Sequence, residues 1–141
     1  MKKFNIAIVV LVVAVVGFIL TGKQSNDISA TRSTKQSSTG VTSFDQVSAS
    51  IAKGGQLLDV RTAEEYAAGH IDGATNFPLQ TMQAGSLPSG SKSQATFVYC
   101  HSGNRAGQAT TILKKAGYTN VTNLGAITHV ESIGGKLVAR S

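Results

Sequence analysis

Several residue types are scarce in this chain of 141 residues, which contains one cysteine, two prolines and no tryptophan. Because Cys100 is the only cysteine, an internal disulfide is excluded, and with it a disulfide-stabilised scaffold. The three histidines are scattered and do not lie at ligand spacing from the cysteine, so we expect no metal ion and no cofactor. The chain has no internal repeats, and its length corresponds to one domain.

Acidic residues are also few, since 7 Asp and Glu side chains stand against 13 Lys and Arg, for a formal net charge of +6. The excess is uneven: residues 1–40 carry a net charge of +4 and the remaining residues a net charge of +2. A nucleic-acid-binding domain would instead present a basic face, interleaved with aromatic side chains, on its folded part. We therefore expect no nucleic-acid partner.

An uninterrupted apolar run occupies residues 6–20, directly after a short, positively charged N-terminus. As a helix this run would span about 23 Å, which is shorter than a hydrocarbon core of roughly 30 Å. Its length therefore fits either a transmembrane anchor at residues 1–22 or a cleaved signal peptide. No Ala-x-Ala-like cleavage site follows closely, which favours the anchor.

Both interpretations predict export of the rest of the chain. A retained anchor would keep the N-terminal lysines in the cytoplasm and hold the protein at the extracytoplasmic face of the membrane, whereas cleavage would release it. Residues 23–40 are rich in Ser, Thr, Asn and Gln and predict a flexible linker, because they cannot bury enough surface to offset their ordering entropy. The folded domain is then expected at residues 41–141, as a monomer.

Short apolar runs alternate with amphipathic segments in this last part of the chain. The pattern predicts strands and helices in alternation: strands at 56–60, 73–79, 95–100 and 120–124, and helices near 43–53, 62–68 and 105–116. Capping boxes mark two helix starts, Ser43 with Gln46 and Thr62 with Glu65. Such alternation is typical of an α/β fold with a mainly parallel sheet, whose ligands bind at the carboxyl ends of the strands.

Cys100 falls at the carboxyl end of one of these strands. A lone cysteine after an apolar strand is often a buried small hydrophobe. Here, however, a polar loop containing Gly103 follows, and a helix begins near Arg105. That arrangement aims unpaired backbone N–H groups and a helix dipole at one point, which favours an anionic sulfur and an anionic substrate. The sequence therefore predicts that Cys100 is a nucleophile.

Two segments resemble the signatures of the rhodanese-like sulfurtransferases. "LLDVRTAEEYAAGHIDGATNFPL" (residues 57–79) is similar to the first signature of that family, and "VYCHSGNRAGQA" (residues 98–109) is similar to its active-site loop, C-x-x-G-x-R. The resemblance covers about residues 42–141. It implies a rhodanese-like α/β fold, with a central, mainly parallel sheet flanked by helices on both faces.

The resemblance also implies an activity, thiosulfate sulfurtransfer through a persulfide on Cys100. Thiosulfate or a similar small molecule would donate the sulfur, and cyanide or a thiol would accept it. The substrate-binding residues would be those of the loop, chiefly through their backbone N–H groups, together with the Arg105 side chain: His101, Ser102, Gly103, Asn104 and Arg105. For the His101 side chain, a solvent-facing position on the rim is favoured over a charged role below pH 7.

Two alternatives stay open beside the sulfurtransferase. The phosphatase and arsenate-reductase relatives of this family have one more residue between cysteine and arginine, and the shorter loop here favours sulfur chemistry. A non-enzymatic persulfide carrier, or a binding module with the same fold, is the other alternative. Asp59 and Arg61 are expected to support the loop as an internal ion pair, with Glu65 as a possible third member.

The chain departs from the family pattern at a few positions. Ala63 and Asp72 stand where proline is usual in the family. Ala126 and His129 replace a typical glycine and aromatic residue, so the packing of the C-terminal segment is the least certain part of the expected fold.

Overall fold

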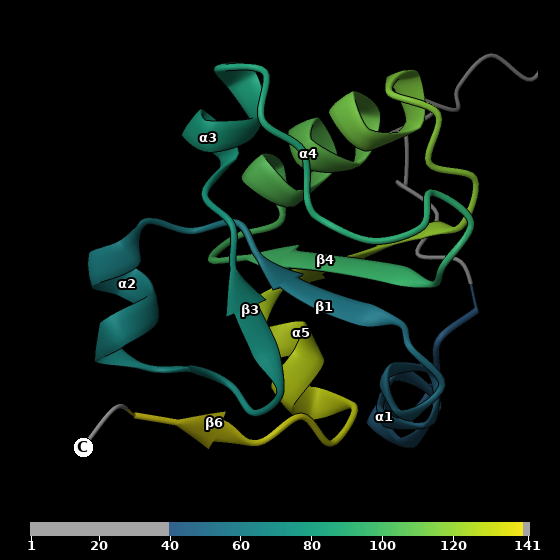
Figure 1. Ribbon diagram of the computed structural model, residues 1–141. Coiled ribbons are helices and arrows are strands. Elements are labelled where there is room, and N and C mark those ends of the chain that lie inside the picture. Colours follow the sequence, from purple (N-terminus) through teal and green to yellow (C-terminus); the bar gives the residue numbers. More distant parts are fainter. Residues whose placement is uncertain (1–39, 140–141) are drawn as a thin grey trace, which may run out of the picture. The chain divides into compact units, whose positions relative to one another are not determined.

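The computed structural model describes residues 40–139 (Figure 1). The predicted anchor at residues 1–22, and the predicted linker except for Gly40, lie outside the described residues. Within residues 40–139, no helix combines the length and the apolar character needed to cross a bilayer.

A four-stranded parallel sheet lies at the centre of the fold, in the order β3-β1-β4-β5. Its strands are β3 (Ala74–Asn76), β1 (Gln56–Asp59), β4 (Thr96–Cys100) and β5 (Val121–Ala126). β4 is an inner strand, and all five of its residues are buried. The register pairs Leu58 of β1 with Val98 of β4. The predicted parallel sheet is thereby confirmed, and the strands end at a common edge.

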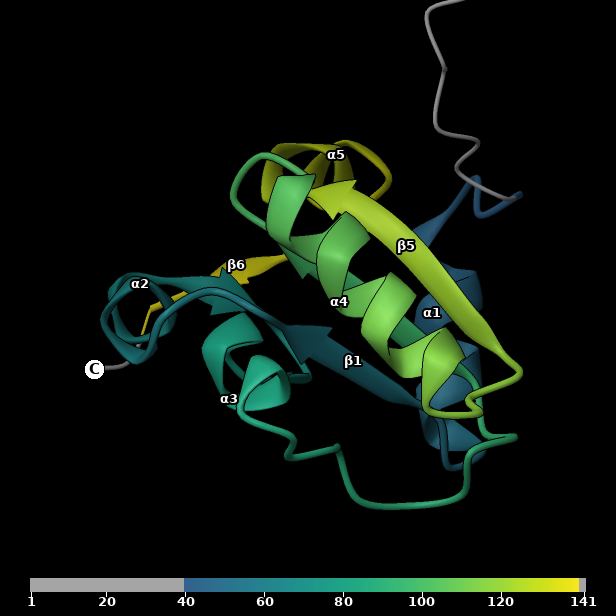
Figure 2. The same ribbon diagram turned by 90° about the horizontal axis from the view of Figure 1, so that it is seen from above.

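Helices cover both faces of this sheet, as Figures 1 and 2 show. One face carries α3 (Leu79–Gln83) and α4 (Asn104–Lys115), and the other carries α1 (Phe44–Ala52) and α5 (Ile127–Ser132). Side chains of β4 point alternately to the two faces. Val98 and Cys100 belong to the core beneath α3 and α4, whereas Phe97 and Tyr99 belong to the core beneath α1 and α5.

The two predicted capping boxes have different outcomes. In α2 (Ala63–Ala68), Thr62 Oγ1 accepts the N–H of Glu65, and the Glu65 carboxylate accepts the N–H of Thr62, as predicted. The other predicted capping box, between Ser43 and Gln46, does not form. Ser43 Oγ accepts the N–H of Asp45, and the Gln46 side chain accepts the N–H of Thr42. Ser43 is still the N-cap of α1, so the predicted start of that helix is confirmed.

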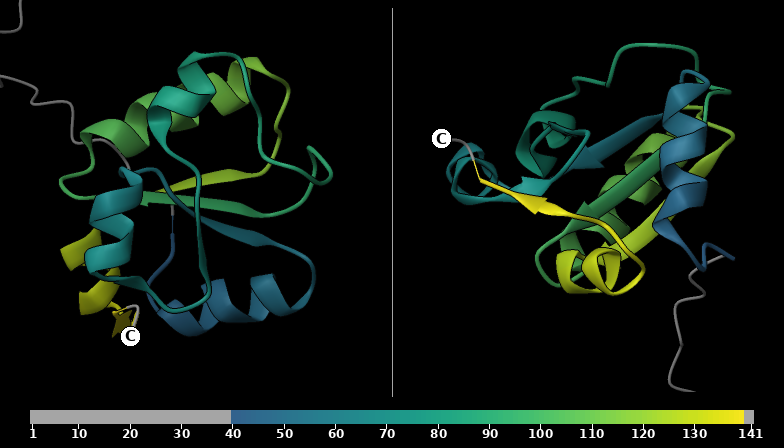
Figure 3. Two further views of the ribbon diagram at one scale, coloured as in Figure 1. Left: turned by 60° about the vertical axis from the view of Figure 1, so that its left-hand side comes forward. Right: turned by 90° about the horizontal axis from the view of Figure 1, so that it is seen from below.

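The sequence pattern does not predict α3 and α5. It also does not predict β2 (His70–Ile71) and β6 (Leu137–Val138), which pair antiparallel below the main sheet (Figures 1 and 3). The backbone N–H of Ile71 donates to the hydroxyl of Tyr99, which ties this small sheet to β4. The segment that departs from the family pattern at Ala126 and His129 forms α5, and its Ile127 and Val130 belong to the same core cluster as Tyr99 of β4.

Candidate active site

β4 places Cys100 at the edge where the parallel strands end. Cys100 is the last residue of this strand, and its side chain is fully buried, with 0% exposure. It packs in the core cluster formed beneath α3 and α4. Burial alone does not distinguish a nucleophile from a cysteine that only fills the core. The groups that contact the sulfur have to distinguish them.

Two backbone N–H groups donate to the sulfur of Cys100. The N–H of Gly103 lies 3.1 Å from Cys100 Sγ, and the N–H of Ala106 lies 3.3 Å from it. Gly103 is the N-cap of α4 and has φ +92°, a value that L side chains rarely adopt, so glycine is needed where the loop turns back toward the sulfur. Because these N–H groups stand at the amino end of a twelve-residue helix, the dipole of α4 adds to their preference for negative charge.

The rest of the predicted loop forms a rim around this point. His101, Ser102 and Asn104 are exposed, whereas Gly103 is half-buried. His101 therefore occupies the solvent-facing position that the sequence favours. The loop packs against the end of β5, where a Cβ atom at Gly103 would lie 3.5 Å from the backbone of Gly125. Of the five predicted loop residues, Gly103 donates its backbone N–H to the sulfur, and His101, Ser102 and Asn104 lie on the exposed side of the loop.

Arg105 forms an ion pair with Glu65, which was expected beside Asp59 and Arg61. Its Nη1 lies 2.5 Å from Oε2 of Glu65, and its Nη2 lies 2.7 Å from Oε1. Glu65 therefore pairs with Arg105 and makes no hydrogen bond to Asp59 or Arg61, which corrects the expected three-membered cluster. The hydrogen bond from Arg105 lowers the pKa of Glu65 to about 2. The same bond raises the pKa of Arg105, to which the nearby Cys100 sulfur also contributes.

Asp59 and Arg61 form the predicted internal ion pair. Nη2 of Arg61 lies 2.6 Å from Oδ2 of Asp59, and both side chains are buried. A brace that the sequence did not reveal is Asn76, whose side-chain amide donates to the backbone oxygens of Asp59 and Arg61 at 3.1 and 2.9 Å. These contacts hold the chain that leaves β1 and do not reach the sulfur, which suits a supporting role.

A shallow pocket of about 240 Å³ adjoins the loop. Its lining comes from α2, α5 and β6 as well as from the loop itself: Arg61, Glu65, Ala68, Gly69, His101, Ile127, Glu131 and Leu137. Leu137, which is 54% exposed, forms an apolar side of the pocket together with Ala68 and Ile127, and Arg61, Glu65 and Glu131 bring charge to it.

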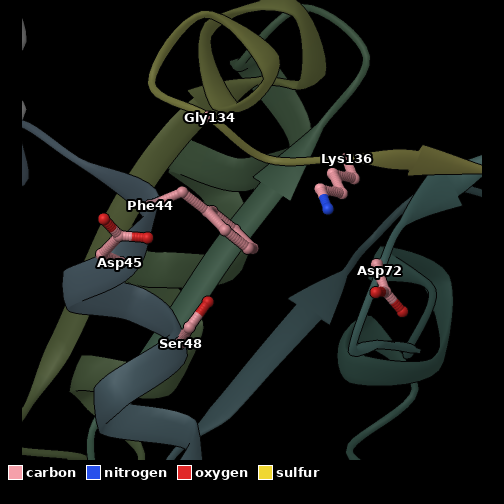
Figure 4. Close-up of a pocket in the computed structure, with 6 residues that line it drawn as sticks. All are labelled: Phe44, Asp45, Ser48, Asp72, Gly134 and Lys136. Atoms are coloured by element: carbon pink, nitrogen blue, oxygen red, sulfur yellow. The ribbon is translucent and has the colours of Figure 1, made fainter.

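Another pocket, of about 260 Å³, lies beside α1 and is shown in Figure 4. It is lined by Phe44, Asp45, Ser48, Asp72, Gly134 and Lys136. None of these residues belongs to the loop, so this pocket is separate from the cysteine site. Across residues 40–139, no group of three His, Cys, Asp or Glu side chains stands close enough together to hold a metal ion.

Comparison with known proteins finds relatives whose names identify them as thiosulfate sulfurtransferases. The thiosulfate sulfurtransferase PspE of Escherichia coli (strain K12) is 40% identical over 73 residues, which cover 50% of this chain and 68% of that protein. Thiosulfate sulfurtransferase 16, chloroplastic, of Arabidopsis thaliana is 35% identical over 82 residues, covering 50% of this chain and 68% of that protein.

A solved structure described as a rhodanese with anions from E. coli has the same fold, with 35% sequence identity and a TM-score of 0.50. The match covers 61% of this chain and 99% of that one. The family of rhodanese-like domains matches residues 43–127, a span that includes both the ion pair after β1 and the loop around Cys100. This chain therefore belongs to the rhodanese-like domain family.

Proposed function

We propose that this protein is a sulfurtransferase that moves a sulfane sulfur from thiosulfate or a similar donor to a thiophilic acceptor through a persulfide on Cys100. The observation that carries the proposal is the placement of the Cys100 sulfur 3.1 and 3.3 Å from two backbone N–H groups at the amino end of α4. A core cysteine needs no such donors. A nucleophilic sulfur that is charged before and after reaction does need them.

The reaction consists of two displacements. The Cys100 thiolate attacks the outer sulfur of thiosulfate, the S–S bond of the donor breaks, and sulfite leaves with its electron pair. The product is a Cys100 persulfide with its negative charge on the outer sulfur. Cyanide then attacks that sulfur and leaves as thiocyanate, which restores the thiolate. The enzyme alternates between two covalent states, so ping-pong kinetics are expected.

The loop supplies hydrogen-bond donors to the sulfur in both steps. The N–H groups of Gly103 and Ala106 face the sulfur, and the remaining loop residues, His101, Ser102 and Asn104, are exposed to an entering donor. Cys100 is fully buried, so a donor has to reach the sulfur past the loop, and this favours a small donor over a bulky one. With no second cysteine in the chain, the persulfide sulfur must leave to another molecule.

The test is a thiosulfate–cyanide assay of the wild type beside Cys100→Ser. Thiocyanate is expected from the wild type alone, and intact mass after thiosulfate treatment should rise by one sulfur atom. No adduct on the wild type would contradict persulfide chemistry altogether. An adduct without turnover to cyanide or to small thiols would favour the alternative of a persulfide carrier. Hydrolysis of an aryl phosphate with the same Cys100 dependence would favour the phosphatase.

For its location, we propose an exported domain held at the extracytoplasmic face by residues 1–22. The support is the apolar run at residues 6–20 after a basic N-terminus. Fractionation of cells that express the full chain tests this proposal, with residues 1–30 sought by mass spectrometry in the membrane fraction. A soluble exported form that lacks these residues would show a cleaved signal peptide instead.

A further inference from the structure

The Glu65–Arg105 pair stands beside the candidate nucleophile, since the Cys100 sulfur contributes to the raised pKa of Arg105. Arg105 is expected to bind the substrate, whereas Glu65 has no role in the reaction as proposed above. Glu65 lies in the first turn of α2, and Arg105 lies in the first turn of α4, 40 positions later in the chain. Both carboxylate oxygens of Glu65 accept hydrogen bonds from the guanidinium, and Oε2 also accepts the N–H of Thr62. The carboxylate is therefore held in place by its own helix as well as by Arg105.

This pairing removes most of the positive charge that Arg105 would offer to an anion. Two of the five N–H donors of the guanidinium are directed to Glu65, and the pair carries no net charge. The electrostatic attraction that remains at the loop comes mainly from the backbone N–H groups and the dipole of α4. Because Coulomb energy scales with the product of the charges, a dianionic donor loses about twice as much attraction through this compensation as a monoanionic donor does.

We propose that Glu65 is a specificity-determining residue that compensates Arg105 and thereby lowers the preference of the site for dianionic donors over monoanionic ones. This inference rests on the proposed sulfurtransferase function. Compared with a site in which Arg105 is unpaired, the wild type favours sulfane-sulfur donors of single charge, such as organic thiosulfonates. Glu65 acts through Arg105 and does not touch the reacting sulfur.

The substitution Glu65→Gln isolates the charge. Glutamine is accepted at the same position of a capping box, so its amide oxygen can still accept the N–H of Thr62 and one hydrogen bond from Arg105. Glu64→Gln is the matched control, because Glu64 lies in the same helical turn, is exposed and makes no ion pair with any of residues 40–139. Both variants change the net charge by the same amount.

The experiment compares thiosulfate, a dianion, with methanethiosulfonate, a monoanion. With the second donor, the Cys100 thiolate takes the outer sulfur and methanesulfinate leaves with the electron pair of the broken S–S bond. At low ionic strength we expect Glu65→Gln to raise the ratio of kcat/KM for thiosulfate over methanethiosulfonate about fivefold to tenfold, chiefly through KM for thiosulfate. Glu64→Gln should leave that ratio unchanged, and added salt should reduce the shift.

The outcomes separate this inference from the proposed function. If the wild type transfers sulfur from neither donor, the sulfurtransferase proposal fails. If the wild type uses both donors but Glu65→Gln alters them equally, or lowers the ratio, Glu65 is structural and this inference is overturned. The double variant Glu65→Gln/Arg105→Gln adds a test, since it removes both charges and should return the ratio to near its wild-type value.

Binding measured without turnover provides a second readout. In a Cys100→Ser background, sulfate and methanesulfonate replace the two donors as unreactive anions of double and single charge. Adding Glu65→Gln should strengthen binding of sulfate more than binding of methanesulfonate, as measured by calorimetry or by the ligand-induced shift in Tm. Equal effects on the two anions would contradict the inference even if the kinetic ratio changed.

Discussion

The guanidinium of Arg61 and the carboxylate of Asp59 form a buried ion pair, with 2.6 Å between Nη2 and Oδ2. Oδ1 of Asp59 also accepts the backbone N–H of Arg61, and Nη2 of Arg61 donates to the backbone oxygen of Gly69. The pair therefore joins the end of β1 to the end of α2, the helix that carries Glu65. Its contacts are with backbone and with Tyr99, which neighbours Cys100 in β4, and none is with the sulfur.

Breaking this pair should destabilise the fold without removing the reacting group. We expect Asp59→Asn to lower the free energy of unfolding by about 3 kcal/mol, because it leaves the buried Arg61 charge without its partner. Denaturant unfolding measures the loss, and Asp72→Asn, at an exposed carboxylate, should change the stability by less than about 0.5 kcal/mol. Folded Asp59→Asn protein should still take up sulfur from thiosulfate. A stability loss no larger than that of the control would contradict the structural role assigned to the pair.

Gly103 offers a test of the loop geometry. With φ at +92°, alanine at this position is expected to cost about 1–2 kcal/mol in backbone strain. Relief of that strain would turn the N–H of Gly103 away from Cys100, so kcat for sulfur transfer should also fall, by roughly tenfold if one charge-assisted hydrogen bond is lost.

Gly85 provides the matched control, because it has φ +96° and open space around the position of a Cβ atom. Gly85→Ala should lose a similar amount of stability in denaturant unfolding, while sulfur transfer by the folded protein stays unchanged. If Gly103→Ala lowered stability but left kcat at the wild-type value, the N–H of Gly103 would not contribute to the reaction.

Much of the fold could be predicted because its signals are local. The alternation of apolar runs with capping residues indicates where the strands and helices lie, and the strand–loop–helix order around Cys100 predicts that N–H groups face the sulfur. Gly103 is informative at the level of sequence, since a loop that turns back on itself needs φ above zero. These features depend on neighbours a few residues apart.

The parts that could not be predicted depend on contacts between distant segments. The sequence predicts the capping-box role of Glu65 but not its pairing with Arg105. Arg61 is near Glu65 in sequence, whereas Arg105 is 40 positions away and reaches Glu65 only through the fold. β2 and β6 contain two residues each, which is too short for any periodicity to be visible. The brace formed by Asn76 likewise requires β3 to lie beside β1.

The stability of the protein should depend on acid through Glu65. Its pKa is lowered from an ordinary value of 4.5 to about 2 by the hydrogen bond from Arg105, so the unfolded chain binds its proton more readily than the folded one. The stabilisation is then fully present above about pH 5 and is lost as the pH falls from 4.5 toward 2. Because the Glu65 side chain is 34% exposed, its contribution at neutral pH should be no more than about 1 kcal/mol.

Denaturant unfolding of the wild type and Glu65→Gln across this range provides the measurement. The difference between their free energies of unfolding should shrink as the pH is lowered. Glu64→Gln should show a weaker dependence on pH, since Glu64 is exposed and lacks an arginine partner within residues 40–139. A Glu65→Gln difference that stayed constant between pH 7 and pH 2 would show that the carboxylate is not paired in solution.

The hydroxyl of Thr110 is buried in α4 and has no hydrogen-bond partner within residues 40–139. Thr110→Val replaces the hydroxyl with a methyl group of similar size, so we expect the free energy of unfolding to rise by about 1 kcal/mol through removal of an unsatisfied polar atom. The neighbouring Thr111 is exposed and donates to the backbone oxygen of Gly107, so Thr111→Val should bring no gain in stability. Urea unfolding of both variants distinguishes the two sites. Destabilisation by Thr110→Val would mean that its hydroxyl finds a partner in solution and that the core beneath α4 is less apolar than its packing indicates.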